Sequence, residues 1–281
     1  MAERRSWIAR HRWLIARRSV QLSVLALFLI GPYAGLWALK GNLASSVLLD
    51  TISLTDPFIA VQSLAAGHKL ETAAIAGALT VAAFYMLLGG RSFCAWVCPI
   101  NPVTDAAAVL RERLGVKTNI KVPRQTSLAL VPILLVLSAI TGTIAFETIN
   151  PITMLHRGLL FGLGMAWLAL IAVFVFDVAL VKHGWCGHIC PVGAFYGLLG
   201  KASLIKVSAA KRSQCTDCGD CFRVCPEPHV IAPALYPKQA TDTPLITNTD
   251  CISCGKCIDV CDDDVFSFAS RLGTKKEAAA S

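Results

Sequence analysis

The sequence predicts an integral membrane, all-α fold of four transmembrane helices, followed by a small α+β domain at the C-terminus. Hydrophobic residues make up 55% of the 281 residues and charged residues only 16%, whereas soluble domains average about 45–50% and 25%. Charge is nearly absent from four long windows and concentrated between them. From residue 208 onward the chain is polar and rich in Asp, Pro and Cys, which predicts a separate domain.

Each of the four apolar windows is long enough for the roughly 20 residues that a bilayer core requires. They are Val20–Leu39, Thr72–Gly90, Thr126–Phe146 and Gly158–Val181. The fourth contains Asp177, and because a carboxylate in hydrocarbon is costly, Asp177 is either functional or satisfied by Lys182 or a neighbouring helix. The segment 1–19 holds six arginines. It is no signal peptide, since the apolar run is too long and no small-residue cleavage pattern ends it.

The distribution of Lys and Arg predicts the orientation, because short loops rich in these residues stay in the cytoplasm. Six precede the first window, six lie between Arg91 and Arg124, and eleven follow the fourth window. We therefore expect a multi-pass protein of the bacterial inner membrane, with both termini and all twelve cysteines on the cytoplasmic side. This asymmetry and contact with anionic lipid account for the net charge of +8, so we predict no nucleic-acid partner.

The membrane region, predicted to span residues 20–207, repeats itself. "LTDPFIAV" corresponds to "TINPITML", with Pro57 and Pro151 94 residues apart, and "FCAWVCPINPV" corresponds to "WCGHICPVGAF" 92 residues later. Two helical hairpins in the same orientation place both Cys-x3-Cys-Pro motifs on one face. The motifs contribute Cys94, Cys98, Cys186 and Cys190. These four thiols are interpreted as a shared cluster site, as two redox-active pairs, or as packing residues at helix ends.

The predicted domain 208–281 contains a second repeat, a C-x2-C-x2-C-x3-C run that recurs after 36 residues. The first run is Cys215, Cys218, Cys221 and Cys225, and the second is Cys251, Cys254, Cys257 and Cys261. Thiols on the reducing side of a membrane favour metal or redox chemistry over disulfides. A structural zinc site would favour pairs of cysteines rather than triplets.

This tail resembles the two-cluster bacterial ferredoxins, in which the fourth cysteine of each run ligates the other cluster. The resemblance implies two [4Fe–4S] clusters. Cys215, Cys218, Cys221 and Cys261 would hold the first, and Cys251, Cys254, Cys257 and Cys225 the second. Pro226 follows Cys225 as in that family, whereas Asp262 stands after Cys261. This departure concerns the backbone turn and not the ligands.

The whole chain resembles the NapH family, the quinol dehydrogenase components of periplasmic nitrate reductase systems. The resemblance rests on the basic N-terminus, the apolar windows, "FCAWVCPINPVTDAA", "WCGHICPVGAFYGLLGK" and the ferredoxin-like tail. It implies electron transfer from quinol, through [4Fe–4S] clusters, to a ferredoxin-like periplasmic partner of the NapG type and a nitrate reductase complex. His156 is a candidate proton acceptor for quinol, and His188 could tune a cluster.

An alternative function belongs to another class. Membrane proteins of nitrous oxide reduction and of cytochrome oxidase assembly share the Cys-x3-Cys-Pro pairs, so the chain could instead be an iron–sulfur maturation factor that reduces a metal or thiol on a client protein. Reduction by quinol in membranes would favour electron transfer. Reduction by a soluble donor, with a metal as acceptor, would favour maturation.

Overall fold

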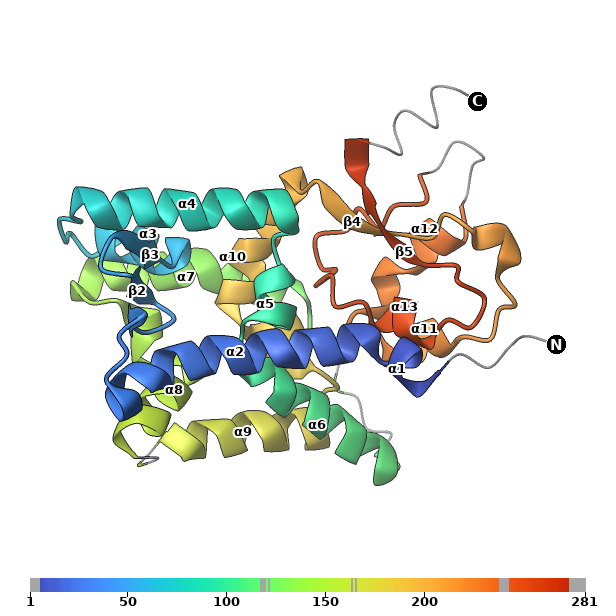
Figure 1. Cartoon of the computed structure of the whole chain (residues 1–281), viewed down its shortest axis with the longest axis horizontal. Helices are drawn as coiled ribbons and strands as arrows, with labels where there is room; N and C mark the ends of the chain where they lie inside the picture. The colour runs from blue at the N-terminus through green and yellow to red at the C-terminus, as the bar shows by residue number, and fades with distance from the viewer. Residues whose placement is uncertain are drawn as a thin grey trace. The chain divides into compact units, whose positions relative to one another are not determined.

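The computed structural model describes residues 6–116, 120, 122–162, 164, 166–237 and 243–272 (Figure 1). The chain forms two compact units, each built from segments that are distant in sequence. The first unit combines residues 1–20, 85–97 and 196–281, and the second combines residues 21–84 and 98–195. The two units are described separately below.

The prediction of four transmembrane helices is contradicted. Among the described residues, one helix is long and apolar enough to cross a membrane, α2 (Arg12–Ala34, 23 residues). The other windows hold shorter helices: α4 (Thr72–Leu88) and α7 (Gln125–Thr141) have 17 residues each, and α9 (Ala166–Ala179) has 14. At 1.5 Å per residue these helices are about 26 and 21 Å long, against a hydrocarbon core of about 30 Å.

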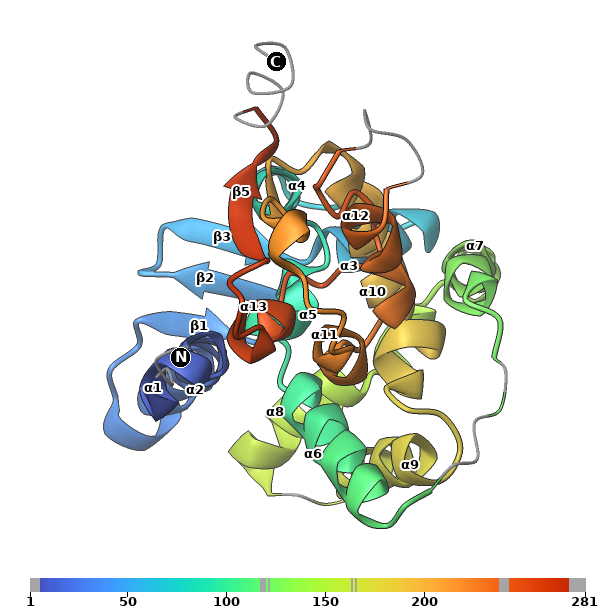
Figure 2. The same cartoon turned by 90° about the vertical axis from the view of Figure 1, so that its right-hand side faces the viewer.

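The second unit contains most of the apolar helices and a small sheet. Besides parts of α2 and α4, its elements are β1 (Leu39–Gly41), β2 (Ser45–Leu48), β3 (Ile52–Thr55), α3 (Pro57–Ala65), α6 (Ile100–Arg113), α7, the 3-10 turn η1 (Ala145–Thr148), α8 (Pro151–Phe161), α9, the π-helical turn η2 (Trp185–Ile189) and most of α10 (Pro191–Leu199). The three strands form an antiparallel sheet in the order β1-β2-β3 (Figure 2).

Two helices of this unit begin in the same way, at the positions related by the sequence repeat. The carboxylate of Asp56 accepts hydrogen bonds from the backbone N–H groups of Phe58 and Ile59 at the start of α3. The side-chain oxygen of Asn150 accepts one from the N–H of Ile152 at the start of α8. A proline occupies the first helical position in both, where its missing N–H costs nothing. The Asp-Pro and Asn-Pro pairs are therefore equivalent N-caps.

The helices of the two halves pack against one another within the second unit. Helix α3 of the first half contacts α7, the opening helix of the second. Helix α8 of the second half in turn contacts α2: the Tyr33 hydroxyl donates a hydrogen bond to the backbone oxygen of Leu159, and the ring of Phe28 packs edge-on against His156. Helix α6 contacts α9. Each half therefore buries the apolar surface of the other.

The first unit is built around the cysteine-rich tail. Its elements are α1 (Trp7–Arg10), the start of α2, the end of α4, α5 (Ser92–Trp96), the end of α10, the 3-10 turns η3 (Gly200–Ala202), η4 (Arg212–Gln214) and η5 (Pro228–Val230), β4 (Ile205–Ser208), α11 (Asp220–Val224), α12 (Ala232–Leu235), α13 (Lys256–Val260) and β5 (Ser267–Ser270). Strands β4 and β5 pair antiparallel, with Ile205 opposite Ser270. The hydrophobic core includes Val207, Ile231, Ile246, Ile258 and Phe266, together with Cys221 and Cys257.

Candidate metal centres

The eight cysteines of the tail line two separate hollows in the first unit. Cys215, Cys218, Cys221 and Cys261 line one, of about 350 Å³. Cys225, Cys251, Cys254 and Cys257 line the other, of about 360 Å³. Each hollow thus combines three cysteines of one run with the fourth cysteine of the other. We call them the first and the second hollow.

The backbone explains why both runs adopt the same form. In each run the second residue after the first cysteine, Asp217 or Ser253, has a positive φ of 55° or 50°. A glycine with positive φ, Gly219 or Gly255, then begins a five-residue helix, α11 or α13. All three features repeat after 36 residues. Three cysteines of each resulting tight loop line the same hollow.

The fourth cysteine of each run ends its helix with an extended backbone. Cys225 follows α11 with ψ 129° and Cys261 follows α13 with ψ 109°. Helices α11 and α13 pack against each other, so the end of each reaches the hollow built by the other run. The backbone is similar after both cysteines, although Pro226 follows one and Asp262 the other.

Burial keeps these thiols neutral in the absence of a compensating positive charge. Burial is the main cause that raises the pKa of Cys221 to about 11, and neighbouring thiols add to it. Burial likewise raises the pKa of Cys251 to about 11, with Lys206 opposing, and that of Cys257 well above its ordinary value. Iron supplies the positive charge that favours thiolates, and its binding releases their protons. Four cysteines that line one hollow, several of them buried, therefore fit a thiolate-ligated cluster.

The two hollows differ in their electrostatic surroundings. At the first hollow, Cys218 is exposed and the Asp217 carboxylate lies 3.6 Å from the Cys215 sulfur. The second hollow has charges of both signs beside it: the charge of Lys206, which is only 6% exposed, acts on Cys251, and the buried carboxylate of Glu227 lines the hollow and acts on Cys225. Cations near a cluster favour its reduction, and carboxylates oppose it.

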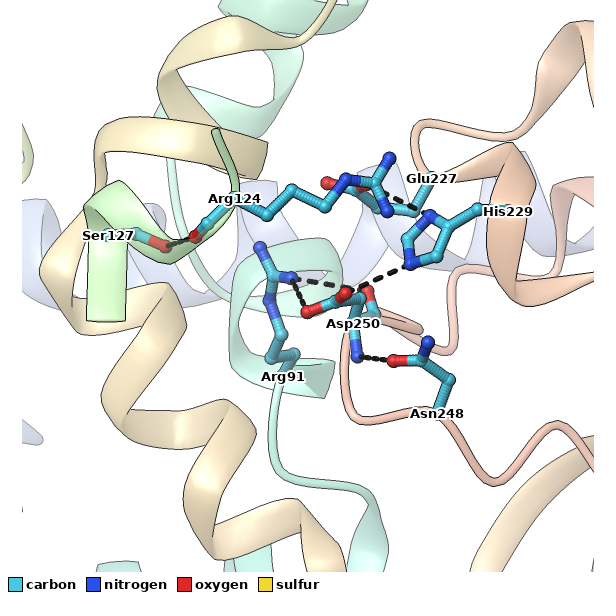
Figure 3. Close-up of polar contacts among 7 residues, drawn as sticks. All are labelled: Arg91, Arg124, Ser127, Glu227, His229, Asn248 and Asp250. Carbon is cyan, nitrogen blue, oxygen red and sulfur yellow. Dashed lines mark hydrogen bonds and ion pairs between the residues drawn. The ribbon is translucent and has the colours of Figure 1, made fainter. Parts of the chain in front are cut away.

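A chain of polar contacts surrounds Asp250, the residue directly before Cys251 (Figure 3). Nη1 of Arg91 lies 3.3 Å from the Asp250 backbone oxygen and 3.4 Å from its Oδ1. Nε2 of His229 lies 3.0 Å from Oδ2 of Asp250, and its Nδ1 lies 3.6 Å from Oε2 of Glu227. Arg91 is only 5% exposed. The contacts hold the Cys251 loop to the segment that precedes Cys94.

Two further contacts fix the second hollow. The indole N–H of Trp96, at the end of α5, donates to the backbone oxygen of Ser253. The Asp259 carboxylate of α13 accepts from the backbone N–H groups of Trp13 and Leu14 in the first turn of α2. These N–H groups have no partner within the helix, so the carboxylate acts as an N-cap supplied by another segment. Helices α5 and α2 thus both bind the second cysteine run.

The structure places the Cys-x3-Cys-Pro motifs at helix ends. Cys94 lies in α5 of the first unit, and Cys98, Cys186 and Cys190 lie in the second unit. The Cys186 thiol lies 3.8 Å from the Thr104 hydroxyl, in the helix α6 that begins two residues after Cys98. Within the second unit the two motifs therefore approach the same helix. All twelve cysteines lie in the described part of the chain, and no disulfide joins any two of them.

The remaining candidates are buried polar groups of the second unit. Asp177 is fully buried, and its Oδ1 accepts from the Trp185 backbone N–H. Arg111 donates to the backbone oxygens of Asp177 and Val178. Asp177 thus orients the segment before Cys186. His156 is buried in α8, and His188 lies in η2.

Sequence reasoning missed Arg91, Trp96, Asp250 and His229. Arg91 and Asp250 stand close before cysteines, which was the one signal available. In the part of the chain that the structure describes, no group of three or more His, Cys, Asp or Glu side chains is arranged to hold a single metal ion.

Comparison with protein families identifies two iron–sulfur domains. A family described as a 4Fe-4S binding domain matches residues 70–117 and 163–209, the segments that contain the two Cys-x3-Cys-Pro motifs. A family described as a 4Fe-4S dicluster domain matches residues 200–265. The predicted ferredoxin-like domain is therefore present, and the chain is an iron–sulfur electron-transfer protein.

Whole-chain relatives agree with this assignment, although no solved structure matches the chain. The ferredoxin-type protein NapH of Escherichia coli is 47% identical over 96% of this chain and 93% of its own length. The methylamine utilization ferredoxin-type protein MauN of Paracoccus denitrificans is 49% identical over 96% and 95%, and MauN of Methylorubrum extorquens is 48% identical over 93% and 90%. The chain belongs to the family of ferredoxin-type proteins that includes NapH and MauN.

Proposed function

We propose that this protein takes part in quinol oxidation at the bacterial inner membrane and passes electrons toward a periplasmic nitrate reductase system. The observation that carries the proposal is the pair of hollows, each lined by three cysteines of one run and one of the other. This is the ligand arrangement of two-cluster ferredoxins. The similarity to NapH over nearly the whole chain supports the nitrate reductase system as the destination.

In this proposal the eight tail cysteines hold two [4Fe–4S] clusters. A bound [4Fe–4S] cluster supplies one-electron redox chemistry. The chain's own residues bury all of these thiols except Cys218 at least in part, and they set the local charge: Asp217 places a carboxylate beside Cys215, whereas Lys206 acts on Cys251 and Glu227 acts on Cys225. We expect the two sites to differ in redox potential.

We assign a third redox centre to Cys94, Cys98, Cys186 and Cys190. The match of both motifs to a 4Fe-4S binding family supports this assignment, as does the approach of Cys186 to the helix that follows Cys98. The centre is either a shared cluster or two thiol pairs that exchange electrons with the tail. Replacement of Cys94 or Cys190 by serine should impair electron transfer to a similar extent and without additivity.

We place the N-terminus and the tail on the cytoplasmic side of the membrane. The six arginines before and within the start of α2 favour this side, and the compact unit that residues 1–20 form with the tail supports a common location. A periplasm-active reporter should be silent when fused after Ser208. Activity after Ser208 would contradict this location.

The assignment of cysteines to clusters can be tested by comparing cysteines that come from different runs but line the same hollow. After anaerobic purification we expect about eight irons from the two tail clusters and two distinguishable EPR signals on reduction. Cys225→Ser should remove the same signal as Cys254→Ser, and Cys261→Ser the same signal as Cys218→Ser. If Cys225→Ser and Cys218→Ser removed the same signal, each run would hold its own cluster. Zinc without iron would overturn the proposal.

The quinol donor is tested in membranes that contain the protein. Addition of a quinol analogue should reduce the clusters. A soluble electron donor, with a metal ion present as the acceptor, should not reduce them in place of the quinol. A ferredoxin-like partner of the NapG type should then be reduced in turn. Reduction only by the soluble donor would favour a maturation factor.

A role in methylamine utilization is a second candidate, because MauN of P. denitrificans is as similar to the chain as NapH is. Complementation separates the two roles. A NapH role predicts restored nitrate reduction in an E. coli strain that lacks NapH. A MauN role predicts restored growth on methylamine in P. denitrificans that lacks MauN.

A further inference from the structure

His156 is a buried histidine whose ring has no polar partner. Its side chain is 1% exposed, and within the described residues neither Nδ1 nor Nε2 has a hydrogen-bond partner. A buried polar group without a partner costs about 1–3 kcal/mol, so native structures seldom retain one without a function.

The sequence repeat provides an internal comparison. Gln62 stands 94 residues before His156, the same separation as between Pro57 and Pro151. The Oε1 atom of Gln62 accepts hydrogen bonds from the Ser138 hydroxyl, at 3.4 Å, and from the Phe146 backbone N–H, at 3.2 Å. The Nε2 atom of Gln62, like both ring nitrogens of His156, has no hydrogen-bond partner among the described residues. The polar side chain therefore makes structural hydrogen bonds through its oxygen in the first half, whereas the corresponding side chain makes none among the described residues in the second half.

The neighbourhood of His156 is aromatic and lies along α2. Phe28, itself buried, packs edge-on with its ring centre 4.9 Å from that of His156. Five residues further along α2, Tyr33 is 74% exposed and bonds to Leu159 of α8. The contact between α2 and α8 therefore extends from the buried His156 to the protein surface, over about 8 Å along the axis of α2.

Helix α2, which contacts His156, also reaches the first Cys-x3-Cys-Pro motif. Seven residues before Phe28, on the same face of α2, the Gln21 side chain lies 3.4 Å from the backbone oxygen of Cys98 and 3.4 Å from Oδ1 of Asn101. Seven residues correspond to about 10 Å along the helix. A ligand at His156 would therefore lie close to a redox centre at Cys98.

We propose that His156 binds the ring oxygen of a quinone or quinol head group at a site between helices α2 and α8. This inference rests on the proposed quinol chemistry and names the residue that would recognise the ligand. A neutral imidazole accepts a hydrogen bond from a quinol hydroxyl at one nitrogen and donates one to a quinone oxygen at the other. The aromatic surface of Phe28 suits a planar ring.

The protonation state of His156 is consistent with this role. Burial, and to a lesser extent the neighbouring charge of Arg157, lowers the pKa of His156 below its ordinary value of 6.5. The imidazole is therefore neutral near pH 7. It keeps one nitrogen as an acceptor, which a protonated ring would lack.

The test measures binding of decylubiquinone, and separately of menadione, to the full-length protein purified in detergent. Quenching of tryptophan fluorescence gives the Kd. We expect His156→Leu to raise the Kd of the better ligand at least about tenfold, or about 1.4 kcal/mol. His156→Gln, which retains a donor and an acceptor, should lie between the leucine variant and the wild type. Gln62→Leu, at the matched position of the first half, should bind as the wild type does.

Thermal unfolding without electron transfer is the second measurement. The better quinone should raise the Tm of the wild type and of Gln62→Leu but not that of His156→Leu. Without quinone, His156→Leu should unfold no earlier than the wild type, since it removes an unpartnered polar group. A wild-type Kd and Tm shift in His156→Leu would overturn this site and leave quinol oxidation standing. Absence of quinone binding and of quinol-dependent reduction in the wild type would overturn both.

Discussion

The indole nitrogen of Trp96 donates a hydrogen bond to the backbone oxygen of Ser253, and the two atoms are 3.0 Å apart. Trp96 ends the helix that carries Cys94, and Ser253 stands between Cys251 and Cys254. The first Cys-x3-Cys-Pro motif and the second cysteine run are therefore held together by a direct bond within one compact unit. The predictions below test this link and the contacts around it.

Trp96→Phe removes the indole N–H and keeps most of the ring. Loss of a partly buried hydrogen bond costs about 0.5–1.5 kcal/mol. Hydrogen exchange should accelerate at the backbone amides of residues 250–255 and remain unchanged at residues 215–221. Trp7→Phe, at a side chain that is 67% exposed, is the control and should change neither. Unchanged exchange in Trp96→Phe would show that the bond does not hold the loop.

Arg91→Gln should destabilise the first unit through Asp250. The guanidinium is buried and contacts both the backbone and the carboxylate of Asp250, and hydrogen bonds to charged groups contribute about 1.5–3 kcal/mol. Denaturant unfolding of the purified protein measures the loss. Arg223→Gln removes an exposed pair with Asp220 and should cost less than about 1 kcal/mol. Equal losses in the two variants would contradict the role given to Arg91.

Gly90→Ala should prevent the first unit from folding. A Cβ atom at Gly90 would collide with the backbone of Tyr196 and Gly200, and the residue has a φ of +44°. The comparison is Gly115→Ala, where φ is +64° but no atom lies within 4 Å of the added Cβ. That change should cost only the roughly 1–2 kcal/mol of the left-handed conformation. Yield and Tm of the two purified variants distinguish the steric effect from the conformational one.

Asp56→Ala and Asn150→Ala should each destabilise the second unit by about 0.5–2 kcal/mol, the usual cost of a lost N-cap. Asp56→Asn and Asn150→Asp retain an acceptor oxygen and should cost less than the alanine variants. Thermal unfolding measures all four. If the alanine variants were as stable as Asp56→Asn and Asn150→Asp, the side-chain oxygens of the two N-caps would not stabilise the second unit.

Short sequence patterns were sufficient to predict some features of the structure. The cysteine spacing predicted the two runs, and their spatial arrangement follows from short loops and five-residue helices. The Asp-Pro and Asn-Pro pairs, which served in the sequence only to recognise the repeat, are N-caps of two helices in the structure, and N-caps act within three residues. Asp250 and Arg91 are 159 residues apart, and no local pattern relates them. Their contact depends on tertiary packing.

The prediction of four membrane spans failed because hydropathy measures the length of an apolar segment, not the length of a helix. The first window continued to Leu39, yet α2 ends at Ala34 and Leu39 begins β1. The third window continued to Phe146, which lies in the 3-10 turn η1, after α7 has ended at Thr141. Apolar residues fill turns and strands in this protein as well as helices.

The cap that Asp259 provides for Trp13 and Leu14 has a consequence for biosynthesis. The carboxylate and the amide of Trp13 are separated by 246 residues, and ribosomes add about 5–20 residues per second. Roughly 12–50 s therefore pass between synthesis of the first turn of α2 and synthesis of its cap. During this interval water or lipid head groups satisfy the two amides, and the Asp259 carboxylate replaces them once the tail has folded.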